Sequence, residues 1–355
     1  MQFTVPIFNP CYTVLNVAED WGITPTTQNL DVVLQQKYRV AGLRVFYDCP
    51  NVHSYDPEVA KIDAKDFDFV ILSDAEFHRT EEILDWIHSR GIENWVLARG
   101  GKTWPYHEHP RMVYRSWWLP LLLKRNQYQD TASHTKPFEF EALLGAQRPH
   151  RDFLWLYMNH HDLLNRSVVT YRTGFPGSLH DENTDQVYEQ FGRKPQWPYV
   201  SPNLDPSWEP FAEVKNTVSF YIPWRIYQHT KYSVICETVS IENDFFFSEK
   251  VMKVLYGQRV FVHLGARGFL RHLHDLGFQT FGDIIDESYD DEPNNVLRWQ
   301  RACEQLQVLA SLDYQQVMAT VCDRLQHNHD HLQAICNHHD QHQLLRQFIP
   351  SEILV

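Results

Sequence analysis

The sequence predicts an α/β protein with two domains, each built around a mostly parallel sheet. The chain has 355 residues, which is more than one hydrophobic core usually spans. Short apolar segments alternate with segments of helical periodicity, and strands separated by helices of this size form βαβ units. A polar, aperiodic stretch at 125–137 interrupts the alternation. We therefore expect an N-terminal Rossmann-like domain over 1–130, a second one over 131–310, and C-terminal helices over 311–355 that pack back towards the first domain.

The first domain contains one segment with helical spacing and several with the composition of buried strands. The helix is expected at 79–91, where Ile83, Leu84 and Ile87 are spaced for one face and Gly91 ends the pattern. The domain has no GxGxxG motif, so nothing in it supports dinucleotide binding. Its strands are expected at 42–48, 66–74, 94–101 and 111–118.

The second domain repeats the alternation around a long irregular segment. A Pro-, Asn- and Asp-rich stretch at about 174–216 is expected to run over the surface. The segment 243–265 reads as an aromatic strand, a Ser-Glu-Lys triplet, a helix ending at Gly257 and an apolar strand. The tail from about residue 295 is predicted to be helical. Further elements are expected as a strand at 138–145, a helix at 152–164 and a strand at 166–171.

Composition and charge narrow the class of protein. Hydrophobic residues make up 43% of the chain, which is ample for burial, and the net charge is −13. That charge disfavours a general binder of nucleic acid or of anionic membranes, because such a binder needs a basic face. The six cysteines are scattered without a CxxC motif, as in a protein with reduced thiols. With no signal-peptide pattern and no apolar run long enough to span a bilayer, a cytoplasmic location, in a bacterium or an infected host cell, is expected.

Two predicted loops of the second domain carry the side chains with the clearest chemical meaning. Each loop follows a strand and opens a helix, and in a parallel sheet all such loops gather at the carboxyl edge, where ligands bind. Helix N-termini present unpaired N–H groups and a partial positive charge, so added cations make a site for a diphosphate. The first loop carries Arg148, His150 and Arg151, and the second carries Ser248, Glu249 and Lys250.

A carboxylate beside the lysine points to a nucleotide rather than to phosphate alone. Glu249 can accept hydrogen bonds from ribose hydroxyls while Lys250 pairs with the phosphates. The alternative is that the two residues form a solvated ion pair in a first helical turn, as many such pairs do.

These residues belong to a longer stretch that resembles a known family. The stretch "ETVSIENDFFFSEKVMKVLYGQRVFVHLGARGFLRHLHDLGFQTF", followed by "DESYD", resembles the C-terminal domain of fucosyltransferase-like and exostosin-like glycosyltransferases of the GT-B fold. The upstream "FEALLGAQRPHRDFLWLYM" is similar to the entry of that domain in bacterial and phage members. The resemblance covers about 138–290 without the irregular segment, and it is most specific over 248–281. Gly257-Gln258-Arg259 departs from it by lacking the family's proline.

The resemblance implies a fold, a reaction and roles for particular residues. It implies GT-B, two Rossmann-like domains facing a cleft, and transfer of a hexose or pentose from a nucleotide-diphosphate sugar. Glu249 and Lys250 would bind the ribose and phosphates, and Arg148 or Arg151 the diphosphate. Glu237 matches the family's early glutamate and is expected to approach the sugar or the nucleotide.

No metal cofactor is expected. Such enzymes stabilise the leaving diphosphate with helix dipoles and cationic side chains. The first domain shows no DxD at the end of a strand, since Asp66 and Asp68 lead into one.

The acceptor side is less defined. An inverting enzyme needs a carboxylate on the first domain to activate the acceptor hydroxyl. Asp74 and Glu76, just past a predicted buried strand, are the candidates, with helix capping or ion pairing as the alternative for each. The resemblance implies a glycan or, as in phage members, a hydroxylated base in DNA as the acceptor. Trp104, Trp117 and Trp118, near several cations, are expected in the core, or else on an acceptor surface.

Two other classes of function compete with the glycosyltransferase hypothesis. The first is a non-catalytic protein that binds nucleotide sugars or glycans. The second is a histidine-rich metal-binding protein, because His327/His331 and His338/His342 are i, i+4 pairs. Their positions relative to the apolar stripe of the tail favour a solvated helix face instead.

Overall fold

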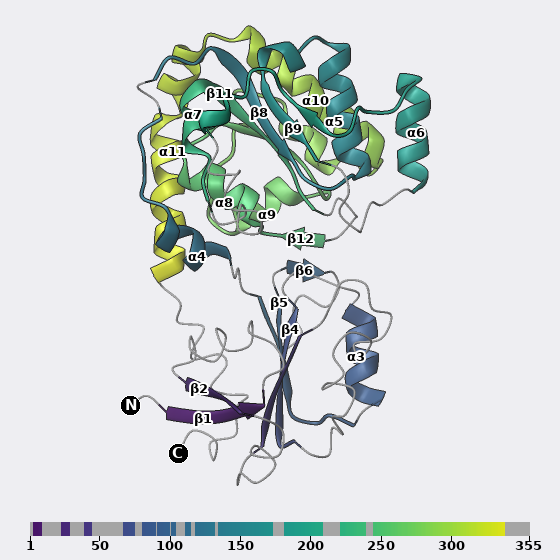
Figure 1. The fold of residues 1–355 in the computed structure, drawn as a ribbon, viewed down its shortest axis with the longest axis vertical. Helices are drawn as coiled ribbons and strands as arrows, with labels where there is room; N and C mark the ends of the chain where they lie inside the picture. Colours follow the sequence, from purple (N-terminus) through teal and green to yellow (C-terminus); the bar gives the residue numbers. More distant parts are fainter. Residues whose placement is uncertain are drawn as a thin grey trace. The chain divides into compact units, whose positions relative to one another are not determined.

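A computed structural model of the chain describes residues 3–8, 23–28, 39–44, 67–74, 80–89, 91–99, 101–103, 111–114, 118–131, 134–172, 181–208, 221–238 and 244–337. The chain divides into two compact units (Figure 1). The first comprises Met1–Trp117 and His338–Val355, and the second Trp118–Asn337.

The first unit contains a six-stranded sheet in the order β2-β1-β3-β4-β5-β7, in which every pair is parallel. Phe69 to Leu72 in β4 are all 2% exposed or less, as expected where both faces of a parallel sheet are covered. Arg39, before β3, donates to both carboxylate oxygens of Asp68, before β4, and so joins the amino ends of these strands. The elements are β1 Phe3–Phe8, β2 Ile23–Gln28, β3 Val40–Arg44, β4 Phe69–Asp74, α3 Thr80–Ser89, β5 Trp95–Arg99, β6 Gly101–Thr103 and β7 Met112–Tyr114.

The second unit contains a five-stranded sheet in the order β10-β9-β8-β11-β13. All pairs are parallel except β10 with β9. From β8 the chain moves to β9 on one side of the sheet, and it later returns to β11 and β13 on the other side. The direction of winding therefore reverses between β8 and β11. The strands are β8 Phe138–Leu144, β9 Val168–Tyr171, β10 Tyr199–Val200, β11 Thr230–Cys236 and β13 Phe261–Leu264.

The helices of this unit form two groups by their contacts. In the first group α5 (Pro149–His160), α6 (Glu182–Phe191) and α10 (Asn295–Ser311) pack together. In the second, α8 (Glu249–Tyr256) packs with α4 (Trp118–Arg125) and α11 (Tyr314–Asn337). Right-handed crossovers that leave the middle of a sheet in opposite directions place their helices on opposite faces, so α5 and α8 cover different faces. The remaining elements are α7 (Trp224–His229), β12 (Asp244–Phe246) and α9 (Phe269–Asp275).

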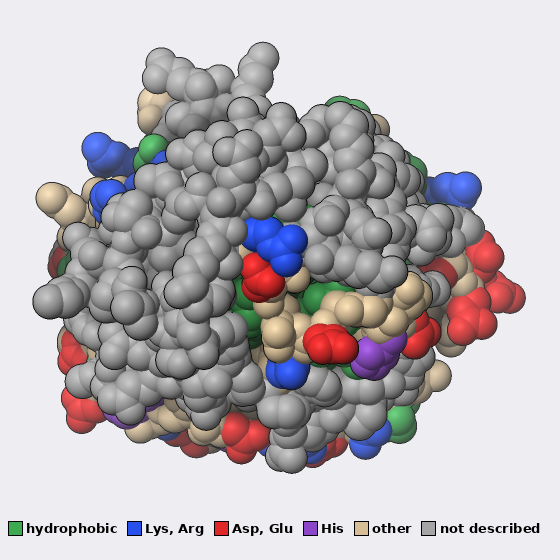
Figure 2. Space-filling view, turned by 90° about the horizontal axis from the view of Figure 1, so that it is seen from below, with side chains coloured by type: hydrophobic (Ala, Val, Ile, Leu, Met, Phe, Trp, Pro, Cys, Tyr) green, Lys and Arg blue, Asp and Glu red, His purple; other side chains and the backbone are tan. Residues whose placement is uncertain are grey.

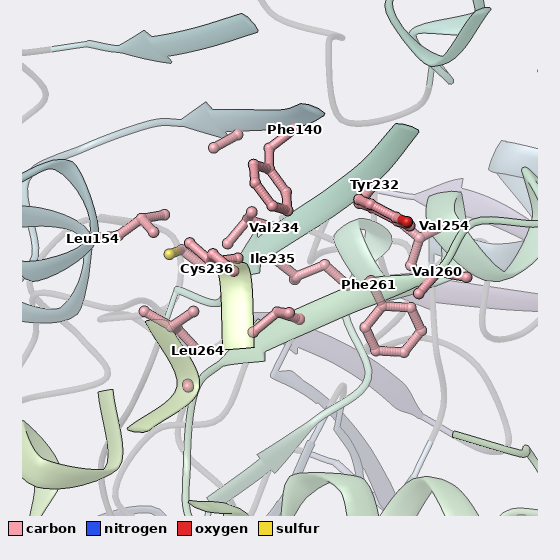
Figure 3. Close-up of a cluster of buried hydrophobic side chains, with 14 of the residues drawn as sticks. Phe140, Leu154, Tyr232, Val234, Ile235, Cys236, Val254, Val260, Phe261 and Leu264 are labelled. Atoms are coloured by element: carbon pink, nitrogen blue, oxygen red, sulfur yellow. The ribbon is translucent and has the colours of Figure 1, made fainter. Parts of the chain in front are cut away.

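One continuous hydrophobic core supports the carboxyl edge of the second sheet. Figure 3 shows Phe140, Val234 and Leu264, from three neighbouring strands, within it. Val251 and Met252, in the first half of α8, are fully buried. Truncating such a side chain to alanine typically costs about 2–5 kcal/mol, so this core holds the start of α8 firmly on the sheet.

The predicted α/β architecture with predominantly parallel sheets is confirmed in both units. The arrangement of the two units around a cleft stays a prediction. Two local expectations differ from the structure. The irregular segment contains α6, which a capping box of Asp181 and Thr184 starts and the buried Val187 anchors. The polar stretch after α4 packs on the second unit, where Tyr128 meets Tyr256 and His329 edge to face. The expectation that the C-terminal helices pack back towards the first domain stays a prediction: α11 packs on α8 and α4 of the second unit, and the tail beyond Asn337 lies outside the described residues.

No helix in the described part of the chain combines the length and apolarity needed to cross a membrane.

Candidate functional site

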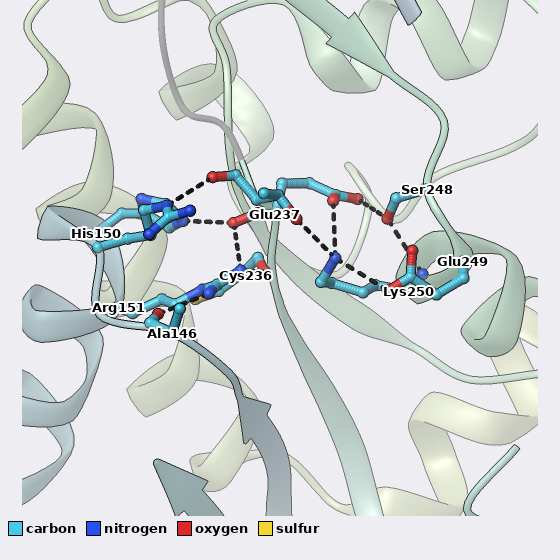
Figure 4. A network of polar contacts seen from close by, with 10 residues as sticks. Ala146, His150, Arg151, Cys236, Glu237, Ser248, Glu249 and Lys250 are labelled. Carbon is cyan, nitrogen blue, oxygen red and sulfur yellow. Dashed lines mark hydrogen bonds and ion pairs between the residues drawn. The ribbon is translucent and has the colours of Figure 1, made fainter. Parts of the chain in front are cut away.

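The candidate site lies at the carboxyl ends of β8 and β11, where the winding of the second sheet reverses. In open α/β sheets, this reversal opens a crevice between neighbouring strands, and ligands bind there. The loop after β8 leads into α5, and Glu237 immediately follows β11. Residues at the start of α8 reach the same place, so three segments of the chain meet at the reversal point (Figure 4).

The backbone at the end of β11 is held by two side chains of α5. His150 Nε2 donates to the carbonyl oxygen of Glu237 at 2.7 Å, and Arg151 Nη2 donates to the same oxygen at 3.0 Å. Arg151 also donates to the carbonyl of Ala146 at 2.7 Å. Burial, followed by the charge of Arg151, holds the pKa of His150 well below its ordinary value, so the imidazole is neutral. Both side chains thus position the end of the strand.

The side chain of Glu237 is buried and connects β11 to the start of α8. It is 2% exposed, and Ser248 Oγ donates to its Oε1 at 2.7 Å. The same Ser248 oxygen accepts from the backbone N–H of Lys250 at 3.1 Å and so caps α8. Ser248 is itself fully buried.

Lys250 lies between two carboxylates. Its Nζ is 3.2 Å from Glu249 Oε1 and 3.6 Å from Glu237 Oε2, and it donates to Thr238 Oγ1 at 3.2 Å. The lysine side chain is 25% exposed and that of Glu249 13%, whereas Glu237 is almost inaccessible. The two α8 side chains are therefore the part of this network that a ligand can reach.

The network carries charges of both signs. Burial raises the pKa of Glu237 above its usual value. Burial also opposes ionisation of Glu249, but the neighbouring Lys250 and Lys253 outweigh it and lower that pKa. For Lys250, burial is outweighed by Glu249 and Glu237, and its pKa is raised. Lys250 is thus firmly cationic, Glu249 firmly anionic, and Glu237 is the carboxylate most easily protonated.

Arg148, the third cation predicted for the site, lies beside the same segment. Its Nε donates to the carbonyl of Thr238 at 3.2 Å, and Nη1 donates to the carbonyl of Gln147 at 2.8 Å. It is the N-cap residue of α5, and its own side chain makes no capping hydrogen bond. Arg148 is 7% exposed.

The structure brings together all predicted site residues of the second unit, namely Glu237, Arg148, His150, Arg151, Ser248, Glu249 and Lys250. Their roles towards a ligand stay predictions. Asp74 is the last residue of β4 and thus lies at a strand end as expected, whereas Glu76, Trp104 and Trp117 lie outside the described residues. Sequence reasoning missed Thr238 and Lys253. The spacing of Lys253, four residues after Glu249 on α8, is the signal that could have found it.

The histidines of α11 contact the end of α9. His327 Nε2 bonds to the carbonyl of Gly277 at 3.0 Å, and His331 Nε2 bonds to that of Leu276 at 2.7 Å. The stacked pair therefore satisfies free carbonyls beyond a helix C-terminus. His338 and His342 lie outside the described residues. Within the described ranges, no group of three His, Cys, Asp or Glu side chains could hold a metal ion.

Comparisons with known proteins add little to this geometry. No protein-family model matches the chain, and no curated protein matches it. Among solved structures, "T4 phage BGT in complex with UDP and Mn2+" is similar over 98% of this chain and 99% of its own, with 11% sequence identity and a TM-score of 0.44. A likeness at this level assigns neither an activity nor a ligand to this chain.

Proposed function

We propose that the protein is a glycosyltransferase that takes a sugar from a nucleotide-diphosphate donor bound by the second unit. The observation that carries the proposal is the pairing of Glu249 and Lys250 at the reversal point of a parallel sheet. The pair is partly exposed, but it is built into the fold through the buried Glu237 and Ser248, unlike an ordinary solvated ion pair.

The chemistry of the pair suits the two parts of a nucleotide diphosphate. Lys250 offers a charge to phosphate oxygens, and Glu249 offers acceptors to ribose hydroxyls. As the bond to the sugar breaks, negative charge grows on the leaving diphosphate. A fixed cation then stabilises the transition state more than the ground state, which accelerates transfer.

Lys250 can perform the electrostatic task of a metal ion, so we propose metal-independent transfer. Transfer should then survive EDTA, because the cation that stabilises the leaving group is part of the chain. Complete loss of transfer in EDTA, with recovery on adding manganese, would contradict this part of the proposal.

We propose that the first unit binds the acceptor. Asp74, at the carboxyl end of β4, or Glu76 would accept the proton of the acceptor hydroxyl. The net charge of −13 favours a glycan acceptor over a hydroxylated base in DNA. The described acidic and basic side chains on the face shown in Figure 2 are mixed, which also favours a glycan acceptor.

The donor proposal is tested by binding. We would screen UDP-glucose, UDP-N-acetylglucosamine, GDP-fucose and GDP-mannose by thermal shift, since a specific ligand raises the melting temperature by mass action. The best of these would then be titrated calorimetrically into wild type and variants. Lys250→Ala should weaken binding by about 10- to 150-fold, which corresponds to a charge-assisted contact of about 1.5–3 kcal/mol. Glu249→Ala should weaken nucleotide-sugar binding while leaving affinity for inorganic pyrophosphate largely intact.

Lys231→Ala is a matched control. Lys231 lies near the start of β11, its side chain is 24% exposed, and it pairs with Glu139 at 3.0 Å. It therefore resembles Lys250 in exposure and pairing but lies at the opposite end of the strand. The proposal fails if Lys250→Ala binds the donor as tightly as wild type. Tight binding without transfer to any glycan would instead indicate a non-catalytic nucleotide-sugar binding protein.

A further inference from the structure

The buried carboxylate of Glu237 has an incomplete set of partners. Ser248 donates to Oε1, but among the described side chains none donates a hydrogen bond to Oε2. The charge nearest to Oε2 is the Lys250 ammonium at 3.6 Å, beyond ordinary hydrogen-bonding distance. Because Glu237 is 2% exposed, bulk solvent does not reach the carboxylate. Its ionised form therefore depends on Lys250 to an unusual degree.

A bound diphosphate would weaken the electrostatic stabilisation that Lys250 gives to ionised Glu237. The ammonium already interacts with Glu237 and Glu249, and phosphate oxygens would compete with both carboxylates for it. They would also bring negative charge towards both carboxylates. A buried carboxylate that loses its counter-ion to an approaching anion responds by taking up a proton. Glu249 is more accessible, and it stays ionised if ribose hydroxyls donate to it.

We propose that Glu237 is a proton-coupled positioning residue, which takes up a proton when a nucleotide diphosphate binds to Lys250. The inference rests on the proposed donor site and adds a linkage between donor binding and pH. In the free protein, ionised Glu237 holds Lys250 in place. In the complex, protonated Glu237 no longer competes with the diphosphate for the charge of Lys250.

The other titratable groups that face Glu237 are poor alternatives for the proton. His150, from α5, already donates its Nε2 proton to the Glu237 carbonyl and lies beside Arg151. Cys236, from β11, is a buried thiol whose pKa burial raises to about 12, so it is already protonated. Burial and the charges of Arg298 and Lys250 lower the pKa of His263, from β13, to about 3. Arg151, whose guanidinium stays charged, has no site for a further proton.

The linkage predicts the sign of the pH dependence. The complex favours protonated Glu237, so the pKa of Glu237 is higher in the complex than in the free protein. Binding is therefore strongest below the free-state pKa of Glu237, and it weakens as pH rises from the free-state pKa to the bound-state pKa. Within that window the dissociation constant should rise by up to about ten-fold per pH unit.

The experiment is calorimetric titration with the best of the four nucleotide sugars. Both phosphates of a nucleotide sugar are diesters, so the probe lacks the ionisation near pH 6 of a terminal phosphate and contributes no proton itself. Titrations in PIPES, imidazole and Tris buffers at one pH give the number of protons taken up, from the dependence of the observed enthalpy on the buffer's ionisation enthalpy. Repeating them from about pH 5.5 to 8.5 gives the slope of the dissociation constant.

Wild type should take up a substantial fraction of one proton. Glu237→Gln, which keeps the acceptor for Ser248, should abolish the uptake and flatten the pH profile. Glu249→Gln should bind more weakly and retain the uptake, and Lys231→Ala should behave as wild type. A purely structural role of Glu237 would change affinity without changing the proton count.

Several results would overturn the inference. Wild type that binds with no proton uptake refutes it while leaving the donor site intact, and so does uptake that survives in folded Glu237→Gln. Loss of uptake in Glu249→Gln would assign the proton to Glu249, and this comparison remains decisive if Glu237→Gln does not fold. If none of the four nucleotide sugars binds, the proposed function itself is wrong, and the inference is overturned with it.

Discussion

The starts of α8 and α9 look alike in sequence and differ in what they leave for a ligand. Each helix begins a few residues after a strand of the second unit, and each has basic residues nearby. At α9, the carboxylate of Asp290 accepts from the N–H groups of Leu270 and Arg271, at 3.0 and 3.3 Å. At α8, a neutral hydroxyl, Ser248, serves as cap, and Lys250 remains partly exposed.

The difference teaches that a helix N-terminus is an anion site only where the chain does not supply the anion. Asp290 is 7% exposed and occupies the position that a phosphate would take at α9. The chain thus closes α9 with its own carboxylate. At α8 the carboxylates pair with Lys250 beside the helix and leave the ammonium accessible.

The largest expected effect is at the N-terminus of α9, which Asp290 caps. Asp290→Ala leaves one buried and one partly buried N–H group without their acceptor, so the free energy of unfolding should fall by about 2–3 kcal/mol. Denaturant titration measures it. Nucleotide-sugar affinity should not change, because α9 is not part of the proposed donor site. Asp290→Asn, which keeps an acceptor oxygen, should lose less. If Asp290→Ala weakens donor binding without destabilising the fold, α9 takes part in the site and the contrast between the helices is wrong.

The next effect concerns His263, which lies in β13 before α9 and is buried without charge. Burial and the nearby charges of Arg298 and Lys250 lower its pKa to about 3. A lowered pKa gives stability that is present above the unfolded-state pKa of about 6.5 and lost as pH falls. The stability lost between pH 6.5 and 5 should be about 2 kcal/mol from this residue.

His263→Phe isolates that contribution, since the introduced phenyl ring would still stack on Phe269, as the imidazole does. The difference in unfolding free energy between wild type and His263→Phe should shift by about 2 kcal/mol, in favour of the variant, from pH 6.5 to 5. Buried carboxylates such as Glu237 act in the opposite direction, but they are common to both proteins. A difference that stays constant with pH would show that His263 is not held neutral.

A smaller effect is expected from the cap of α8. Ser248→Ala removes both the cap of Lys250 N–H and the hydrogen bond to Glu237, and should cost about 1–2 kcal/mol of unfolding free energy. It should also weaken donor binding, because Glu237 and Lys250 lose their common support. Ser311→Ala removes an exposed hydroxyl that bonds only to a helix carbonyl, and serves as the control. Equal stability of the two variants would show that the hydrogen bonds of Ser248 do not contribute to the free energy of unfolding.

The smallest effect is expected for an exposed ion pair beside the start of α9. Arg271 and Asp291 pair at 3.1 Å with side chains 60% and 71% exposed. Arg271→Ala should change the unfolding free energy by less than about 0.5 kcal/mol, and added salt should reduce that further. A loss comparable to that of Asp290→Ala would show that the surface pair, rather than the buried carboxylate, stabilises the start of α9.

The sequence by itself determined the features that depend on near neighbours. The strands β4, β5, β8, β9 and β13 and the helices α3, α5, α8, α10 and α11 follow from apolar periodicity, and the Ser248 cap from its position before α8. It missed β1 and β2, since each contains a proline, which argues locally against a strand. It also missed α6, whose polar residues hide a capping box.

Tertiary structure alone decided which partners the charged groups have. His150 bonds to the carbonyl of Glu237, 87 residues away, and nothing around either residue encodes that contact. Similarly, Asp290 closes α9 from 20 residues beyond Leu270. Such contacts depend on the order of strands in the sheet, and that order is set by the burial of many side chains at once, whereas a helix or its cap is set by a few adjacent residues. The sequence could therefore place Glu249 and Lys250 on one helical turn, but only the folded sheet brought the buried Glu237 beside them.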